Sequence, residues 1–200
     1  MCWNAAVSLQ TFMIGIIGIL YAYINKYPFV ELLFFFSFTL MQLIEYYIWI
    51  YINNRSINKL LSIATILLIG IQPIISILTI YRTYNTISKY LLFVYILAAV
   101  ITIMYIDLEI FKTYRGKNGH LVWGWLTKDK INIINVILYF VCLFLPLLLS
   151  GKYELLIFGL STLVISLYYY IKYDTWGSMW CWLVNFWVMI VVIINILIKR

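Results

Sequence analysis

The stretch "PFVELLFFFSFTLMQLIEYYIWIY", residues 28–51, decides how this sequence folds. Aromatic and aliphatic side chains dominate it, and Glu45 is a carboxylate deep inside the run. About 20 consecutive, mostly apolar residues in an α-helix are enough to cross the hydrocarbon core of a bilayer. The stretch therefore predicts a membrane-spanning helix that carries an acid in its interior.

The whole chain has the same character. It is 66% hydrophobic and 10% charged, and its mean hydropathy is +1.01. A soluble domain is roughly half apolar and about a quarter charged, so this chain has too few charges to cover a soluble surface. Its apolar runs are long and unbroken, whereas the strands of a membrane barrel are short and alternate in polarity. The sequence predicts an all-α, polytopic membrane protein.

Seven transmembrane helices are predicted in one domain that covers residues 1–200. Their expected bounds are 5–24, 28–51, 60–82, 89–110, 131–149, 153–172 and 175–198. Pro73 is expected to kink the third helix. Between the fourth and fifth helices, "LVWGWL" (121–126) is interpreted as an amphipathic or re-entrant segment lying in the membrane interface.

The loops predict an orientation. With seven helices the two termini lie on opposite sides, and the loops after the second, fourth and sixth helices share the N-terminal side. That side carries eight of the 14 Lys and Arg residues, namely Arg55, Lys59, Lys112, Arg115, Lys117, Lys128, Lys130 and Lys172. The bias predicts a cytosolic N-terminus. The N-terminal residues lack a basic start and a cleavage pattern, so the first helix is expected to remain in the mature chain.

The net charge of +7 is explained by this topology, and no nucleic-acid partner is expected. The basic segment "FKTYRGKNGH" (111–120) is expected to meet anionic lipid headgroups. The bilayer itself is the predicted partner, with a proton, a small cation or a small apolar molecule as candidate ligands and a homo-oligomer as a further option.

Helix direction places several polar side chains in the N-terminal half of the membrane. Gln42, Glu45 and Trp49 have the spacing i, i+3, i+7 and share one side of the second helix. Glu45 and His120 are the candidate proton acceptor and donor. Candidate ligand-binding residues in the same half are Ser8, Gln42, Asp107, Trp180 and Asn185.

Each of these residues has a structural alternative. Glu45 can be a buried acid that accepts a hydrogen bond from Tyr or Trp, and His120 an interfacial histidine. Asp107 and Glu109 can be helix-end residues, Asp174 a helix N-cap, and the Ser, Thr and Asn stripes contacts between helices. On the third helix, Thr65, Gln72, Ser76 and Thr79 share one side, which either lines a permeation route or packs against a neighbour.

The sequence contains no strong catalytic motif such as H-E-x-x-H, G-x-S-x-G or a Walker loop. A single histidine excludes zinc hydrolases that use several. Cys2, Glu45, His120 and Cys181 are weak metal-ligand candidates because no two lie close in sequence. Three cysteines form no disulfide framework, and the identity of any cofactor stays unknown.

Three functions remain open. The first is a proton- or small-cation-linked transporter or channel with Glu45 and His120 near one membrane face. The second is an intramembrane enzyme or metal-binding protein that acts on an apolar substrate. The third is a non-catalytic viral membrane scaffold in which Glu45 is structural.

Short motifs along the chain resemble one family. They are "MCWNAAVS" (1–8), "QLIEYYIW" (42–49), "GHLVW" (119–123), "LPLLLSG" (145–151) and "MWCW" (179–182). Together they resemble an uncharacterised family of multi-pass membrane proteins of bacteria and large DNA viruses, to which no activity is assigned. The resemblance implies a seven-helix protein of a viral or host membrane, and it marks Cys2, Ser8, Gln42, Glu45, His120 and Cys181 as family positions. Trp3 and Asn4 depart from the Phe and Ser expected there, which leaves a role for the first turn in doubt.

Overall fold

The computed structural model of the protein describes residues 4–105, 108–127 and 133–175, together with 179–180, 182–183, 185–186, 190 and 193–194. This part of the chain contains six α-helices. They are α1 (Ala5–Ile24), α2 (Phe29–Ile50), α3 (Arg55–Thr79), α4 (Asn85–Tyr105), α5 (Ile133–Leu149) and α6 (Tyr153–Tyr173). The prediction of an all-α fold is confirmed at this level.

Helix boundaries follow local capping where the prediction differs from the structure. Helix α3 begins at Arg55 rather than at residue 60 because the Asn54 side chain accepts a hydrogen bond from the Ile57 N–H at 3.1 Å. Helix α4 runs over Asn85–Tyr105 instead of 89–110. Most of the predicted seventh helix lies outside the described residues, although the described pieces between 179 and 194 are helical.

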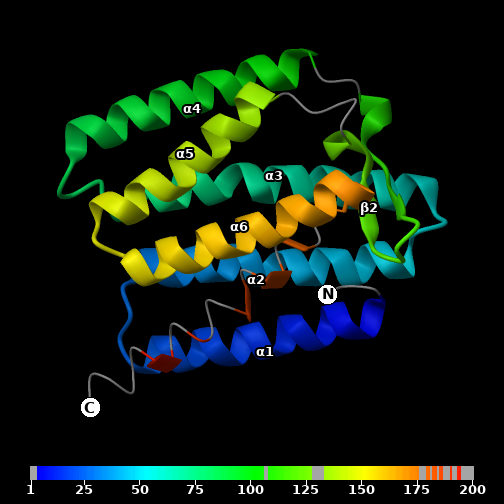
Figure 1. Ribbon diagram of the computed structural model, residues 1–200, viewed down its shortest axis with the longest axis horizontal. Helices are drawn as coiled ribbons and strands as arrows, with labels where there is room; N and C mark the ends of the chain where they lie inside the picture. The colour runs from blue at the N-terminus through cyan, green and yellow to red at the C-terminus, as the bar shows by residue number, and fades with distance from the viewer. Residues whose placement is uncertain are drawn as a thin grey trace.

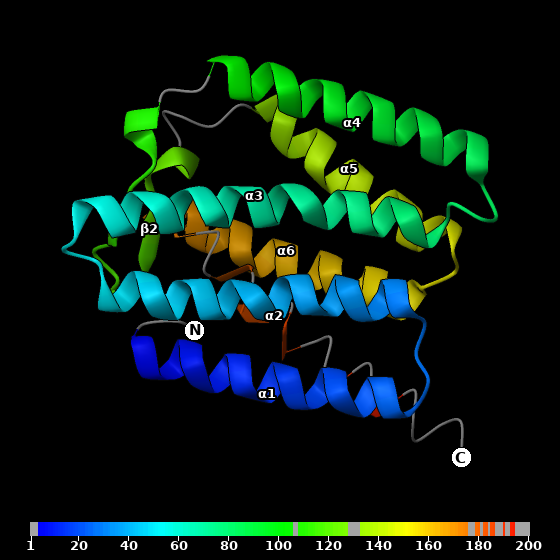
Figure 2. The ribbon, with the colours of Figure 1, turned by 180° about the vertical axis from the view of Figure 1, so that it is seen from behind.

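The helices lie side by side, and their axes are nearly aligned except that α5 runs obliquely between α4 and α6 (Figures 1 and 2). Helix α2 packs between α1 and α3, and α3 packs on α5. Helix α4 lies along the far edge against α3 and α5, and α6 packs on α5. Because successive helices alternate in direction, the start of α3 and the ends of α2, α4 and α6 gather at one end of the bundle.

A small β-hairpin covers that end, which we call the hairpin end. Strands β1 (Thr113–Arg115) and β2 (Leu121–Trp123) pair antiparallel, and Gly119 in the connecting turn takes a φ of 81°. Short 3₁₀ turns flank the pair, η1 (Leu108–Ile110) and η2 (Gly124–Leu126). The segment "LVWGWL" is thus a strand followed by a 3₁₀ turn, and its predicted place in a membrane interface stays a prediction. The side chains of β2 are buried in the core, since Leu121, Val122 and Trp123 are at most 3% exposed.

The hairpin is held on α3 by a buried amide. The Asn58 side chain donates to the Thr113 carbonyl at 2.9 Å and accepts from the Thr113 N–H at 2.8 Å. Ser62 and Thr113 share a hydroxyl–hydroxyl hydrogen bond of 2.8 Å. On the other side, the Asn118 amide donates to the Thr175 hydroxyl just beyond α6. The hairpin therefore joins α3 to the end of α6.

The outer surfaces of the bundle are apolar. Five of the described helices are long and apolar enough to cross a membrane, and α5 is a shorter apolar helix. Large side chains point outward from the edge helices, for instance Phe93 on α4 at 65% exposure and Val164 on α6 at 68%. Soluble proteins rarely expose apolar surface of this extent to water.

Polar contacts join the helices inside the bundle. Tyr139 of α5 donates to the Gln72 side chain of α3 at 2.7 Å, and Ser76 donates to the Leu143 carbonyl at 2.7 Å. These residues of the predicted stripe on α3 therefore pack against α5. Pro73 lies inside this contact, in a helix that is continuous from Arg55 to Thr79. The kink expected at Pro73 stays a prediction.

Helices α1 and α2 approach each other closely at Gly15, in the middle of α1. A Cβ at Gly15 of α1 would lie 2.6 Å from Thr39 Cγ2 and 2.9 Å from Asn185 Oδ1, so α1 and α2 would have to move apart. Gly15→Ala is expected to lower the unfolding free energy by about 2 kcal/mol through overpacking. The matched control is Gly70→Ala on α3, where an added Cβ meets nothing within 4 Å. Equal unfolding midpoints for the two variants in detergent would contradict this packing.

Candidate functional site

The central residues of the candidate site lie on α2. Gln42 and Glu45 are both 0% exposed and are about one helical turn apart, so they share one side of the helix. Met41 and Ile48, also on α2, are fully buried in the main hydrophobic core. The sequence placed an acid inside an apolar helix, and the structure encloses that acid in protein instead of exposing it on the outer surface.

His120 lies on the hairpin. It is 7% exposed, and its ring meets the ring of Tyr169 of α6 edge to face at a centroid distance of 6.5 Å. Its backbone N–H donates to the Asn118 side chain at 3.3 Å. Burial lowers the pKa of the His120 imidazole, because the charged form loses hydration. The neutral ring is therefore favoured while the hairpin is docked.

This shift predicts a pH dependence of hairpin docking. An undocked His120 has an ordinary pKa near 6.5, so it binds more protons than the docked ring as the pH falls below about 6.5. Docking is expected to weaken on acidification and to be independent of pH above that range. Hydrogen exchange of residues 113–123, corrected for intrinsic rates and compared at about pH 5 and pH 7.5, measures the effect. His120→Phe keeps a ring against Tyr169 and is expected to remove the dependence; an unchanged dependence would exclude His120 as its source.

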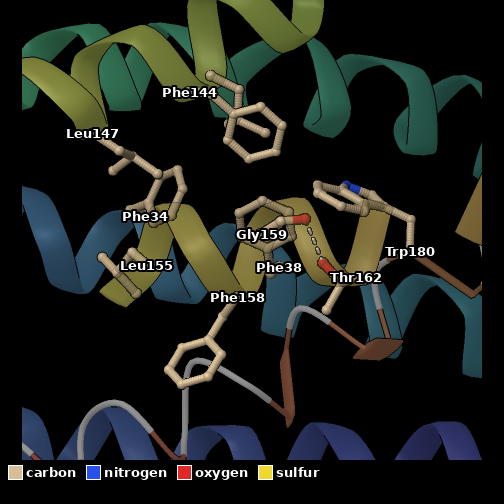
Figure 3. A pocket seen from close by; sticks show the side chains of 10 residues that line it. Phe34, Phe38, Phe144, Leu147, Leu155, Phe158, Gly159, Thr162 and Trp180 are labelled. Carbon is tan, nitrogen blue, oxygen red and sulfur yellow. Dashed lines mark hydrogen bonds between the residues drawn. The ribbon is translucent and has the colours of Figure 1, made fainter. Parts of the chain in front are cut away.

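Trp180 forms part of an apolar crevice between α2, α5 and α6. Its ring meets those of Phe38, Phe140 and Phe144 edge to face at 5.6 to 6.4 Å. The crevice has a volume of about 20 Å³ and is lined by Phe34, Phe38, Leu143, Phe144, Leu147, Leu155, Phe158, Gly159, Thr162 and Trp180. In Figure 3 the Trp180 indole turns toward Phe144 and Phe38, whereas Phe158 points away from them. This space holds little more than one water-sized group, so it is a packing gap between helices and is too small for a substrate.

Two predicted ligand-binding residues make contacts within and between helices. Asn185 accepts a hydrogen bond from the Thr39 hydroxyl at 2.7 Å and donates to the Thr11 carbonyl at 3.1 Å, which ties the C-terminal segment to α1 and α2. Ser8 is fully buried, and its hydroxyl donates to the Asn4 carbonyl on its own helix at 3.4 Å. Both residues occupy structural positions of the kind that hydrogen-bonding side chains fill in membrane bundles.

A second cavity lies at the hairpin end, among residues that sequence reasoning did not bring together. Its volume is about 460 Å³, and it is lined by Ile52, Asn53, Arg55, Asn58, Lys59, Glu109, Phe111, Lys112, Thr113 and Tyr114. The Glu109 carboxylate pairs with Arg55 at 2.9 Å and with Lys59 at 3.0 Å. The Lys59 ammonium and the Arg55 guanidinium hold the pKa of that carboxyl below its ordinary value. The basic segment 111–120 was the only sequence signal for this cavity.

Other predicted residues are not placed in a common site. Cys2, Asp107 and Cys181 lie outside the described residues, so half of the predicted metal-ligand set has no described position. Within the described part of the chain, no three His, Cys, Asp or Glu side chains form a group that could hold a metal. Asp174, predicted as a helix N-cap, instead ends α6 in the left-handed conformation with a φ of 57°.

Comparison with protein-family models, curated proteins and solved structures finds no match to this chain. The family resemblance of the short motifs therefore stays a prediction, and the function is argued from the site alone.

Proposed function

We propose that this chain is an integral membrane protein of seven helices that moves protons or small cations, with Glu45 as the exchanging group. The apolar length of the described helices and the apolar surfaces of α4 and α6 support membrane embedding. The helical pieces between 179 and 194, within an apolar run that the sequence continues to residue 198, support a seventh span. Among the described residues, six Lys and Arg side chains lie at the hairpin end and four at the opposite end, which supports a cytosolic position for the hairpin end.

The main support for the proposed transport is that Glu45, which lies in an apolar helix, is completely buried. A charged side chain at the centre of a spanning helix costs about 2.5–3.5 kcal/mol on insertion scales. Acids kept at such a cost usually face the interior of the bundle and act in ion or proton pathways. Gln42, one turn away and equally buried, extends the polar surface along the same side of α2.

The hairpin supplies the second element of the proposal. It covers the end of the bundle toward which α2 runs from Glu45, and His120 is its buried titratable residue. Because the undocked hairpin favours the charged imidazole, protonation of His120 opens this end in the proposed cycle. Glu45 then exchanges its proton or cation with the aqueous side.

A flux assay tests the proposal. Purified full-length protein is reconstituted into phosphatidylcholine liposomes with a trapped pH-sensitive dye, and the membrane potential is clamped with potassium and valinomycin. A pH step applied between about pH 5 and pH 8, where histidine titrates, is expected to produce protein-dependent proton movement. Replacing potassium with sodium or lithium at fixed pH distinguishes a cation-coupled flux from a simple proton flux. Liposomes with protein that are no leakier than empty ones under every condition would overturn the proposal.

The hydrogen bonds between helices favour a second candidate, a non-catalytic membrane scaffold, including a scaffold of a viral membrane. Asn185, Gln72 and Ser76 each join separate segments, and Glu45 could be one more buried structural group. This candidate predicts that Glu45→Gln lowers the thermal unfolding midpoint while the unmodified protein shows no flux. The enzyme or metal-binding alternative gains no support from the described residues.

A further inference from the structure

The cavity of about 460 Å³ at the hairpin end has the size of a ligand pocket. Pockets for small molecules and headgroups usually measure about 300–1,000 Å³. It lies between the end of α2, the start of α3 and the chain from η1 to β1. Its walls combine cations with amide and hydroxyl groups, as recognition of a polar anion requires.

The charges on its walls favour an oxyanion. Arg55, Lys59 and Lys112 contribute three cations, whereas Glu109 contributes one carboxylate. The two oxygens of Glu109 accept from Arg55 Nη2 at 2.9 Å and from Lys59 Nζ at 3.0 Å, so these two cations already converge on one oxyanion of the chain itself. Lys112 is exposed and has no ion-pair partner among the described residues. The pocket therefore keeps a net positive charge.

The pocket also lies at a defined level of the bundle. Helix α2 ends at Ile50 and α3 begins at Arg55, so the pocket begins where these two apolar helices end. If the helices span a bilayer, this is the level of the phospholipid phosphates. Of the ten Lys and Arg residues in the described part of the chain, six lie at this end, namely Arg55, Lys59, Lys112, Arg115, Lys117 and Lys172. Anionic lipids concentrate in the cytoplasmic leaflet.

We propose that this cavity binds the phosphate of an anionic phospholipid headgroup. Lys112 contacts the phosphate directly, and Arg55 and Lys59 share their donors between it and Glu109. Glu109 thus acts as an internal counter-ion that competes with the lipid. The proposal rests on the membrane embedding of the proposed function and not on proton or cation flux.

Lipid titration of the detergent-solubilised full-length protein tests the proposal. Phosphatidylglycerol, but not phosphatidylcholine, is expected to raise the thermal unfolding midpoint and to saturate. In Arg55→Gln/Lys59→Gln the apparent affinity should fall at least about tenfold, as expected for two cations that each contribute near the membrane surface. The matched control is Arg82→Gln/Lys89→Gln, which removes the same two residue types from exposed positions at the opposite end of the bundle. Equal affinities in the two double variants would overturn the pocket and leave only general electrostatic attraction.

A variant of opposite sign protects the test against simple misfolding. Glu109→Gln removes the internal competitor and is expected to raise the apparent affinity for phosphatidylglycerol several-fold. Weaker binding in this variant would contradict the assigned competition. Inorganic phosphate is titrated in parallel: if millimolar phosphate alone shifts the midpoint as strongly as the lipid does, the ligand is a free phosphate and the lipid assignment is wrong.

The lipid titration and the flux assay test the two proposals independently. Proton movement in pure phosphatidylcholine liposomes does not involve this pocket, so the Arg55→Gln/Lys59→Gln variant should retain it. In the unmodified protein, equal responses to phosphatidylglycerol and phosphatidylcholine with intact flux would reject the pocket alone. Intact lipid selectivity of the unmodified protein without flux would reject the transport proposal alone.

Discussion

Replacement of Glu45 with Gln is expected to lower protein-dependent proton flux at least about a hundredfold, the scale of losing a positioned proton-transfer group. Glutamine has nearly the same shape as glutamic acid and can still form hydrogen bonds in the enclosed position on α2. It cannot exchange a proton or neutralise a cation at neutral pH. The flux assay in phosphatidylcholine liposomes measures the loss directly, at equal reconstituted protein.

The matched control for this variant is Glu154→Gln. Glu154 lies in the first turn of α6 at the end opposite the hairpin, and it is exposed. It is expected to leave both the flux and the unfolding midpoint unchanged. If Glu45→Gln retains the full flux, the exchanging group lies elsewhere; if it also lowers the unfolding midpoint, Glu45 is the buried structural acid of the scaffold alternative.

Replacement of Asn58 with Leu is expected to undock the hairpin. Leu fills a similar volume but cannot pair with the Thr113 N–H and carbonyl, which Asn58 contacts at 2.8 and 2.9 Å. Two buried backbone groups then lose their partner, at about 1–3 kcal/mol each. Hydrogen exchange across residues 113–123 is expected to accelerate by about two orders of magnitude or more, with smaller changes in α1 and α2.

A graded control separates this pairing from general damage to α3. Ser62→Ala removes only the hydroxyl contact with Thr113 and should cost about 1 kcal/mol of docking. Protection of residues 113–123 that is the same in the unmodified protein, Ser62→Ala and Asn58→Leu would show that the hairpin is held by its buried apolar side chains alone.

The helices could be predicted because each is specified locally. An apolar run near 20 residues long, ended by polar turns such as "NKYP" (25–28), determines both the type and the extent of α1 and α2. Only a cap decides the start of α3, so the prediction missed its first turn: Asn54 begins that helix ahead of the apolar run.

The hairpin could not be predicted in the same way. Its strands are three residues each, too short for a pattern, and they are held by the contact of Asn58 with Thr113, which lies 55 positions away and meets it at the start of α3. The basic pocket has the same origin, since Arg55 and Lys59 precede Glu109 by 54 and 50 positions in the sequence. Contacts at such separations leave no local trace in one sequence.

The candidate site was predictable only in part. Helical spacing put Gln42 and Glu45 on one side of α2, and both are buried. Helical spacing could not predict that the Asn185 side chain forms hydrogen bonds to both α1 and α2. The position of an asparagine on a helix is the same whether its side chain binds a ligand or a neighbouring helix. Whether Cys2, Asp107 and Cys181 join Glu45 stays a prediction, since they lie outside the described residues.

In the proposed function Glu45, although enclosed by the bundle, exchanges protons or cations with water. Difference infrared spectroscopy of the protein reconstituted in lipid tests this most directly, by following the carboxyl C=O stretch while the bulk pH and the sodium concentration are changed. We expect a carboxyl band that responds to one of these changes and is missing from the Glu45→Gln protein. Identical difference spectra for the unmodified protein and Glu45→Gln would contradict it, because Glu45 would then be sealed from the solvent on both sides.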